Sequence, residues 1–400
     1  MIERELSKRV KKINETRKVL LVTGPRQVGK TTMLKSLAEN NRKYVSLDDL
    51  NLRKLAQDDP KLFMMTYKPP IIIDEIQYAP NLLSYIKLDV DSNENKGIYW
   101  LTGSQKFHLM KGVSESLAGR VGILEMTSLS YAEKHNFESN VFDPRNLKTK
   151  FEMDPVHLFE EIFKGGMPEY YVNNIDRKDF FDSYIRTYIE RDVRDLTNVK
   201  NIVTFEKFLV SMASRNGELL NYNSISQDAG IDEKTAKLWT SILVQSDIIY
   251  LLQPYMSNEL KRVTKTPKIV FMDTGLCAYL CKWDNAINLM NSSVSGHYLE
   301  TFIISELIKN KRNSTEQLDY DIYFYRDRDG KEIDLLIYFN NTLYPFEIKK
   351  TANPTKEMLK NFDILSKTNK EIGQGGVICL YPEIIPLTEK EKIIPISCIF

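Results

Sequence analysis

The stretch GPRQVGKTT, residues 24–32, constrains this chain more than any other part of its sequence. It follows an apolar run at 19–22 and precedes a helix-like stretch at 33–37. The spacing G-x-x-x-x-G-K-T is that of a phosphate-binding loop, and it is meaningful where a strand precedes the loop and a helix follows it. Glycines let backbone N–H groups converge on phosphate oxygens, and the helix N-terminus adds positive dipole. A chance glycine-rich turn between a strand and a helix is the alternative interpretation.

The side chains of this loop divide between a nucleotide and its metal ion. Lys30 is placed to reach the β and γ phosphate oxygens, and Thr31 to offer its hydroxyl to Mg²⁺. We therefore expect ATP and Mg²⁺ as the ligands. The predicted nucleotide-binding residues are Gly24, Pro25, Arg26, Gln27, Val28, Gly29, Lys30, Thr31 and Thr32.

A second, acidic element is required to hold the metal ion and to order the attacking water. Three consecutive isoleucines at 71–73 indicate a buried strand, which ends at Asp74 and Glu75. Asp74 is predicted to bind Mg²⁺ directly or through water, and Glu75 to polarise the attacking water. Taken alone, this stretch is also typical of a strand that ends in a solvated acidic turn.

Three further residues are candidates for catalysis. Ser104 and Gln105 follow a strand candidate, where a sensor of the γ phosphate would stand, although either residue also suits a helix cap. Arg120 follows the next helix and is a candidate arginine finger, acting on a neighbouring subunit's nucleotide if the protein forms rings. A solvated or structural arginine is the alternative for Arg120.

Size and composition limit the remaining choices. A chain of 400 residues exceeds what one hydrophobic core usually serves, so we expect two or three domains. With 55 Lys and Arg against 54 Asp and Glu, the net charge of +1 neither favours nor excludes DNA. No apolar run approaches the roughly 20 residues of a membrane span, and the four cysteines show no paired framework. We expect a cytoplasmic protein with no membrane partner.

Short apolar runs alternate with helical stretches over the first 140 residues or so. This alternation predicts an α/β fold with a parallel sheet that is buried on both faces. From about 155 to 200 the pattern is helical with one break at 165–168, which indicates a small helical lid. The strand candidates of the sheet are residues 19–22, 43–47, 70–73 and 98–101.

Residues 201–262 have a winged-helix pattern, with a short helix, a glycine turn, a longer amphipathic helix and an apolar run at 248–252. Helix-turn-helix geometry would present Lys234, Thr235 and Lys237 to a major groove. Phosphate binding normally needs a clear excess of Lys and Arg, whereas here acidic residues roughly cancel the charge. Nucleic-acid contact and protein packing both stay open for this unit. The acidic neighbours are Asp228, Asp232 and Glu233.

A second set of carboxylates lies near the C-terminus. Glu347 and Lys349 share one face of a strand candidate, and the turn at 340–341 can bring Asp334 alongside. Two carboxylates that hold Mg²⁺ and a lysine that steadies developing charge are the chemistry of a metal-dependent nuclease. Glu300, on a helix, could add a further ligand. Polar residues on an exposed strand face are the alternative.

Several of these stretches together resemble the AAA-type ATPases. They most resemble a bacterial and archaeal subgroup whose ATPase module is fused to a C-terminal domain with a restriction-endonuclease-like fold. In one recurring stretch, Arg191 or Arg194 is either a lid arginine directed to the nucleotide or part of a salt-bridged helix face. The stretches that carry the resemblance are residues 24–32, 71–77, 101–105, 117–120, 165–169, 188–192 and 273–275.

The resemblance implies a division of the chain and two competing functions. Asp334, Glu347 and Lys349 resemble the PD-(D/E)XK pattern, although Ile333 stands where that pattern has proline. One hypothesis is an ATPase that couples nucleotide state to a nuclease-like domain that engages nucleic acid, with DNA as the candidate partner. The other is a nucleotide-switched regulatory ATPase that binds a protein and does not cleave. A homo-oligomer is compatible with both. The implied domains are an AAA-type P-loop ATPase core at 1–150, a helical lid at 151–200, a winged-helix-like connector at 201–262 and an α/β restriction-endonuclease-like domain at 263–400.

Overall fold

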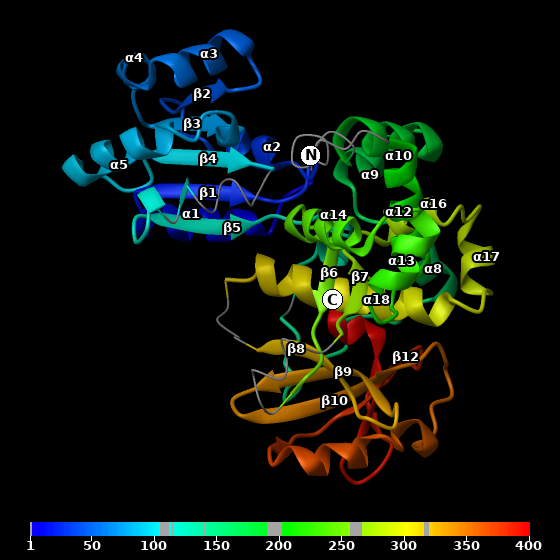
Figure 1. Cartoon of the computed structure of the whole chain (residues 1–400). Coiled ribbons are helices and arrows are strands. Elements are labelled where there is room, and N and C mark those ends of the chain that lie inside the picture. The colour runs from blue at the N-terminus through cyan, green and yellow to red at the C-terminus, as the bar shows by residue number, and fades with distance from the viewer. Residues whose placement is uncertain are drawn as a thin grey trace.

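The computed structural model describes residues 2–104, 112–113, 115–139, 141–173, 175–189, 202–256, 266–315 and 320–400 (Figure 1). Gln105, Arg191 and Arg194 lie outside the described residues. Within the described part of the chain, no helix has both the length and the apolar character needed to cross a membrane.

A five-stranded sheet forms the N-terminal unit, in the order β2-β3-β4-β1-β5, and neighbouring strands run parallel throughout. Four strands form where the sequence predicts them, and β5 is an addition. The apolar pattern of the sequence does not predict β5, because this strand lies at the sheet edge, where only its Leu124 is fully buried. In addition, Gly122 interrupts its apolar run. The strands are β1 (Val19–Thr23), β2 (Lys43–Ser46), β3 (Ile71–Asp74), β4 (Tyr99–Gly103) and β5 (Val121–Glu125).

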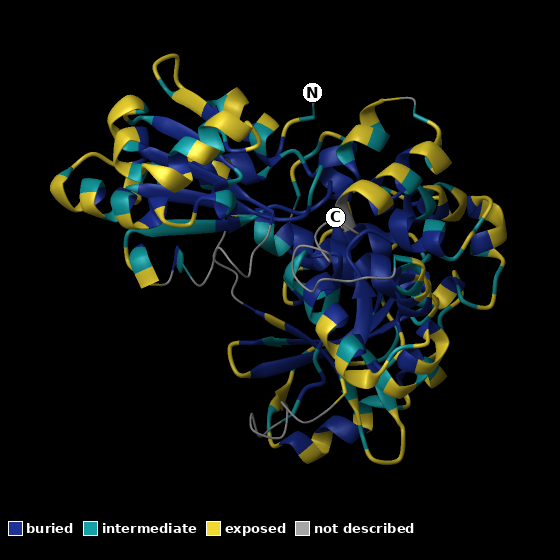
Figure 2. Ribbon diagram, turned by 45° about the horizontal axis from the view of Figure 1, so that its top comes forward, coloured by how far each residue is buried: buried dark blue, intermediate teal, exposed yellow. Residues whose placement is uncertain are grey.

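Helices cover both faces of this sheet, so its inner strands β1, β3 and β4 are buried in Figure 2. Ile72 packs with the helices of one face, whereas Ile71 and Ile73 pack with those of the other. Successive strand side chains alternate between faces, which explains why three consecutive isoleucines are all buried. The first face carries α1 (Leu6–Thr16) and α2 (Lys30–Leu37). The second carries α3 (Leu50–Asp58), α4 (Pro60–Thr66) and α5 (Leu82–Ser92), and the turn η1 (Ile76–Tyr78) follows β3.

A helical region follows the sheet, as the sequence predicts. Asp154 caps α8 by accepting the backbone N–H of His157, and Pro155 occupies the first helical turn. The predicted break separates α8 from α9, and Gly165 there has a φ of +77°, which favours glycine. The elements are α7 (Tyr131–Lys134), α8 (Pro155–Lys164), α9 (Pro168–Val172), α10 (Arg177–Tyr184) and the π-helical turn η2 (Ile185–Ile189).

The next unit has the predicted short helix, glycine turn, longer helix and strand. Gly230 ends the short helix with a φ of +69°, and Asp232 caps the longer helix. The strand β6 pairs antiparallel with β7, so the predicted boundary at 262 separates two strands that are paired. The elements are α12 (Ile202–Ser214), α13 (Tyr222–Ala229), α14 (Glu233–Gln245), β6 (Ile249–Leu252) and β7 (Lys268–Phe271).

A mixed sheet in the order β13-β14-β12-β10-β9-β8 forms the C-terminal unit, with β11 paired to β10. The predicted turn at 340–341 is present, since Asn340 and Asn341 turn the chain between β9 and β10. Gly330 forms a second turn between β8 and β9, and all three residues have positive φ. The strands are β8 (Asp321–Arg326), β9 (Glu332–Phe339), β10 (Thr342–Ile348), β11 (Glu371–Ile372), β12 (Gly376–Cys379), β13 (Ile385–Pro386) and β14 (Lys392–Pro395). The helices are α16 (Thr274–Leu280), α17 (Ala286–Met290), α18 (Ser295–Asn313), η3 (Lys356–Leu359), η4 (Phe362–Thr368) and η5 (Ile396–Ile399).

The helix α18 links these units, because it is buried along most of its length. Its Arg312 guanidinium lies 3.1 Å from Glu125 at the end of β5 and 3.1 Å from Asp247 before β6. Its Glu306 accepts the backbone N–H of Tyr131 at 2.7 Å. One helix therefore contacts the parallel sheet, the α7 region and the β6 region through charged groups.

Candidate functional site

The predicted phosphate-binding loop lies at the carboxyl end of β1 and leads into α2, which begins at Lys30. Gly24 has a φ of +143°, and a Cβ atom there would lie 2.0 Å from the Met126 carbonyl oxygen. Gly29 has a φ of +90°, which any other residue adopts only with strain. The two glycines of the motif are thus required by the backbone itself. The loop presents its N–H groups at a helix N-terminus, as a phosphate site requires.

The Lys30 ammonium lies inside this loop. It donates to the carbonyl oxygens of Gly24 at 2.9 Å and of Pro25 at 2.7 Å, and its side chain is buried. The positive charge is therefore held inside the loop, and its contact with phosphate oxygens stays a prediction.

Asp74 lies directly opposite Thr31, as the sequence predicts. The Thr31 hydroxyl donates to Asp74 Oδ1 at 2.7 Å, and the Tyr44 hydroxyl donates to Oδ2 at 2.9 Å. The Thr102 hydroxyl also donates to this carboxylate. Burial and the nearby Asp74 charge raise the pKa of Tyr44 to about 12, so its hydroxyl stays a donor. A hydroxyl and a carboxylate oxygen at one point are ligands that Mg²⁺ accepts.

Glu75 follows in a left-handed conformation with a φ of +57°, which is uncommon for a residue with a side chain. Its backbone N–H bonds Thr102 Oγ1 at 3.1 Å, so the strained turn is tied to β4. Its carboxylate accepts from the Ser104 hydroxyl at 3.3 Å and from the side chain of Gln77. Ser104 therefore lies within the site, next to Glu75. Strained residues held by their neighbours are frequent at functional sites.

Sequence reasoning missed Tyr44, Thr102 and Gln77. Gln77 and Thr102 lie within motif stretches, two residues after Glu75 and two before Ser104, so their spacing was a usable signal. Tyr44 lies on β2, and only the parallel pairing of β2 with β3 brings it to Asp74.

Arg120 does not reach this site within its own chain. It precedes β5, which runs parallel to β1, so it lies at the amino edge of the sheet while the loop lies at the carboxyl edge. Five residues of strand separate the two edges by about 16 Å. Arg120 is ion-paired with Asp91 on the surface.

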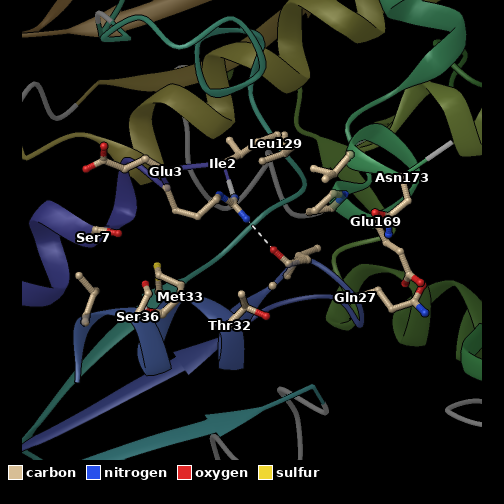
Figure 3. Close-up of a pocket in the computed structure, with 16 residues that line it drawn as sticks. Ile2, Glu3, Ser7, Gln27, Thr32, Met33, Ser36, Leu129, Glu169 and Asn173 are labelled. Carbon is tan, nitrogen blue, oxygen red and sulfur yellow. Dashed lines mark hydrogen bonds between the residues drawn. The ribbon is translucent and has the colours of Figure 1, made fainter. Parts of the chain in front are cut away.

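A cavity of about 640 Å³ opens beside the loop (Figure 3). Gly29, Thr32 and Met33 line one side of it, the N-terminal residues Ile2 and Glu3 line another, and α9 closes it. Its size is within the range of small-molecule pockets. Glu169 and Asn173 line the cavity on the α9 side in Figure 3.

Arg4 braces the loop from the N-terminal side of the cavity, and sequence reasoning missed it. Its guanidinium donates to the Val28 carbonyl at 2.6 Å, the Thr127 carbonyl at 2.8 Å and Glu133 Oε1 at 2.9 Å. The first of these bonds is the dashed line in Figure 3. No local pattern marks Arg4, because its partners are distant in the sequence.

Two glycine stretches that resemble the AAA subgroup contact each other next to this cavity. Asp273 accepts the backbone N–H of Gly166 at 2.8 Å and that of Leu276 at 2.9 Å. A Cβ at Gly165 would lie 2.4 Å from Asp273 Oδ1, and one at Gly275 would lie 2.4 Å from the Lys164 carbonyl oxygen. The glycines permit a close contact between the end of α8 and the start of α16.

The structure also brings together the four predicted residues of the C-terminal cluster. Lys349 Nζ lies 2.7 Å from Asp334 Oδ2 and 2.7 Å from Glu347 Oε2. Glu300 contributes to the cluster from α18. Lys268 Nζ lies 2.7 Å from Glu300 Oε1. The four predicted residues thus form one charged cluster, in which Glu300 and Glu347 are buried and Asp334 and Lys349 are half-buried.

Lys268 and Glu332 are members of this cluster that sequence reasoning missed. Lys268 Nζ lies 2.6 Å from Glu332 Oε1, and Arg326 Nη1 lies 3.0 Å from Glu332 Oε2. Lys268 comes from β7, which the sequence analysis did not single out for this cluster. Glu332 begins β9 two residues before Asp334, so alternation along the strand was the available signal.

Burial dominates the electrostatics of the cluster. It raises the pKa of Glu347 to about 8 and that of Glu300 to about 7, and in both cases the Asp334 charge adds to the effect of burial. Burial acts against Asp334 as well, but Lys349 and Lys268 hold its pKa below the usual value. Glu347 Oε1 is buried and has no hydrogen-bond partner among the described residues. An orphaned carboxylate oxygen of this kind fits a divalent cation.

The pH dependence of stability should reveal Glu347. Its folded pKa of about 8 exceeds the ordinary value of 4.5, so the folded state binds the proton more tightly. This stabilisation is complete at a pH below the ordinary pKa of 4.5, and it is lost as the pH rises through the folded pKa of about 8. Glu347→Gln cannot ionise, so its urea midpoint should fall less between about pH 5 and pH 9 than the parent's. Glu357→Gln, on the surface of the same unit, should keep the parent's slope, and a parental slope in Glu347→Gln would contradict the burial argument.

The helix α14 offers little positive charge. Lys237 Nζ lies 3.7 Å from Glu233, and Arg215, just after α12, lies 2.6 Å from Asp228. The predicted cancellation of charge is thus observed as ion pairs at these residues.

Comparison with known protein families supports the prediction of an AAA-type domain in the N-terminal unit. Residues 16–135 match the family model described as an AAA domain. Residues 156–287 and 295–399 match models described as domains of unknown function, DUF8612 and DUF4143. Together with the loop geometry, the first match defines the N-terminal unit as an AAA-type P-loop ATPase domain.

Relatives extend over much of the chain. An uncharacterized protein of Mycobacterium tuberculosis, Rv2008c, is 26% identical over 356 residues, which cover 88% of this chain and 75% of the relative. The uncharacterized protein MJ1637 of Methanocaldococcus jannaschii is 26% identical over 297 residues, which cover 65% of this chain and 61% of the relative.

Solved structures are similar only at a low level. The RuvB Holliday junction branch migration motor of Thermotoga maritima has 15% identity and a TM-score of 0.30, covering 62% of this chain and 88% of that one. The signal transduction ATPase PH0952 of Pyrococcus horikoshii has 13% identity and a TM-score of 0.22, covering 78% of this chain and 47% of that one. These likenesses are too weak to assign a function.

Proposed function

We propose that this chain binds ATP with Mg²⁺ at the carboxyl edge of the parallel sheet and hydrolyses it. The observation that carries the proposal is the 2.7 Å contact of the Thr31 hydroxyl with Asp74, directly beside the buried Lys30 ammonium. Thr31 and Asp74 would hold Mg²⁺, which supplies charge neutralisation at the β and γ phosphates when bound. Lys30 adds a fixed positive charge on the same phosphates.

Glu75 is the residue that we assign to the attacking water. Its carboxylate is oriented by Gln77 and by Ser104, whose hydroxyl donates at 3.3 Å. A carboxylate held in this way can orient the water and accept its proton. Ser104 then links the position of Glu75 to the end of β4, where a γ-phosphate sensor is expected.

The cavity beside Gly29 and Thr32 suits the adenosine part of the nucleotide. It continues from the loop and is lined mostly by apolar and small polar groups, and its volume of about 640 Å³ is sufficient. Because α9 forms one wall, the nucleotide would contact the helical region directly.

The coupling to the rest of the chain would start at that wall. Gly166, two residues before α9, is bound by Asp273, which caps α16. Closure of α9 on the nucleotide would therefore pull on α16, which packs against α18. The helix α18 in turn carries Glu300 of the C-terminal carboxylate cluster.

For this cluster we propose contact with nucleic acid in a nuclease-like domain. The orphaned Glu347 oxygen favours a bound divalent cation, and Arg326, Arg328 and Lys331 on the adjacent hairpin would suit a phosphate backbone. The ATPase would then control the placement of a metal-dependent phosphate site.

A regulatory ATPase that does not cleave is the second candidate, and one observation favours it. Lys268 pairs with two carboxylates of the cluster and Lys349 with two, so internal ammonium groups already neutralise the charge that a metal ion would neutralise. In this case the C-terminal unit binds a protein or DNA without chemistry.

Arg120 would act between copies of the chain in either case. Its place at the amino edge of the sheet excludes the nucleotide of its own chain, so a role as an arginine finger requires a second copy, whereas its ion pair with Asp91 fits the structural alternative. A homo-oligomer is therefore part of the proposal.

The test is an ATPase assay in Mg²⁺ with no DNA, with duplex DNA and with single-stranded DNA, scored at the same time for cleavage. Turnover that Lys30→Ala abolishes is expected, and its absence from the parent would overturn the assignment. Stimulation with cleavage would select the nuclease candidate. Stimulation without cleavage, in a preparation whose Glu347→Ala variant behaves identically, would select the regulatory one.

A further inference from the structure

A third cluster of ligand-type side chains lies outside both sites described above. His135 follows α7, and His157 and Glu161 lie four residues apart on α8, where they share one face of the helix. One nitrogen or oxygen atom from each of the three lies within 4.8 Å of the others. His135 Nε2 is 3.4 Å from Glu161 Oε1.

The three residues differ in the polar neighbours that they already have. His157 Nε2 lies 3.5 Å from the Tyr131 hydroxyl, and His157 Nδ1 lies 3.8 Å from Glu160 Oε2. His135 Nε2 is buried and makes no hydrogen bond within the described part of the chain, although Glu161 is close. The other oxygen of Glu161 is paired with Lys134. One carboxylate oxygen thus faces the imidazoles while an ammonium holds the other, which is how outer partners commonly orient a ligating carboxylate.

We propose that His135, His157 and Glu161 bind a divalent transition-metal ion, for which zinc is the best match. Two imidazoles and one carboxylate are a common zinc donor set, whereas Mg²⁺ and Ca²⁺ prefer oxygen ligands alone. Zinc–ligand bonds of about 2.0–2.2 Å place tetrahedral ligand atoms roughly 3.3–3.5 Å apart. The His135–Glu161 pair already has this spacing, and the ligand atom of His157 lies within 4.8 Å of both.

The position of the site indicates a structural role. The ion would join the end of α7 to α8, which are separated by the segment 136–154 in the sequence. The Tyr131 ring lies against the His135 ring in a tilted arrangement with centroids 4.3 Å apart, and Phe400 stacks on Tyr131 at 4.3 Å. The metal ion would therefore fix the place where the C-terminal residue packs against the region that follows the ATPase sheet. Closing a long segment stabilises a fold mainly by restricting the unfolded chain.

The experiment is a zinc titration of the full chain after chelator treatment, in competition with a chromogenic zinc indicator. One zinc ion per chain that depends on His157 is expected. His157→Ala should weaken binding by more than the roughly 10–100-fold that loss of an outer-shell partner costs. His157 is the chosen variant because its side chain is partly exposed, so its loss leaves the fold intact. His297→Ala, on α18, is the matched control and should bind zinc as the parent does.

Two further measurements separate this site from other zinc ligands. Cobalt(II) at the site should give no thiolate charge-transfer absorption, because no cysteine takes part. Glu357→Gln, on the surface of the C-terminal unit, should retain the full zinc affinity, because it lies outside every proposed site. Zinc binding of parental affinity in His157→Ala, or thiolate absorption with cobalt, would overturn the proposal.

Discussion

Replacing Glu75 with glutamine should stop ATP turnover while ATP still binds. Glutamine keeps the size of the side chain and a hydrogen bond to its neighbours, but it cannot accept the proton of the attacking water. Loss of a positioned base typically costs roughly 10²–10⁴-fold in rate. The measurement is the steady-state rate of phosphate release, together with equilibrium binding of a fluorescent ATP analogue.

Two other variants make this result specific. Lys30→Ala removes a charge that binds the phosphates in both ground state and transition state, so it should lose affinity as well as turnover. Glu94→Gln, on the surface of the same unit, changes the same functional group and should leave both quantities unchanged. A Glu75→Gln protein that turns ATP over at the parental rate would show that another group orients the water.

The ATPase unit was largely predictable because its motifs are local. Each motif consists of residues that lie close together in the sequence: the glycines of the loop, the isoleucines of β3 and the small residues after β4. Parallel pairing then brings Asp74 to Thr31 without further information. What the motifs omit are long-range partners such as Arg4 and Tyr44, which reach the site only through the tertiary fold.

Arg120 illustrates the opposite limit. The number of residues between Arg120 and the phosphate-binding loop does not show at which edge of the sheet Arg120 lies. That edge depends on the direction of β5, a strand that the sequence pattern did not predict. The C-terminal cluster is intermediate. The hairpin predicted the contact between Asp334 and Lys349, but Lys268 enters from a strand that pairs with the preceding unit.

The close contact between α8 and α16 should be required for stability and for nucleotide binding alike. In Gly275→Ala the added methyl group would lie 2.4 Å from the Lys164 carbonyl oxygen and 2.9 Å from the Gly165 Cα. Both are backbone atoms, so the two helices must separate. Overpacking of this kind costs about 1–3 kcal/mol. The urea midpoint of unfolding should fall accordingly.

The chain provides a matched control for this substitution. Gly296 is the second residue of α18, as Gly275 is of α16, and a Cβ there would meet nothing within 4 Å. Gly296→Ala should leave the midpoint unchanged or raise it, because alanine favours helix by about 1 kcal/mol over glycine. Equal midpoints in the two variants would contradict the contact.

Nucleotide affinity then distinguishes a local effect from a general one. Because Asp273 holds Gly166 beside the wall that α9 forms, separating α8 from α16 moves that wall. In the absence of urea, where both variants are fully folded, Gly275→Ala should therefore weaken ATP binding, whereas Gly296→Ala should not. Retained affinity in a destabilised Gly275→Ala protein would mean that the contact supports the fold without transmitting nucleotide state.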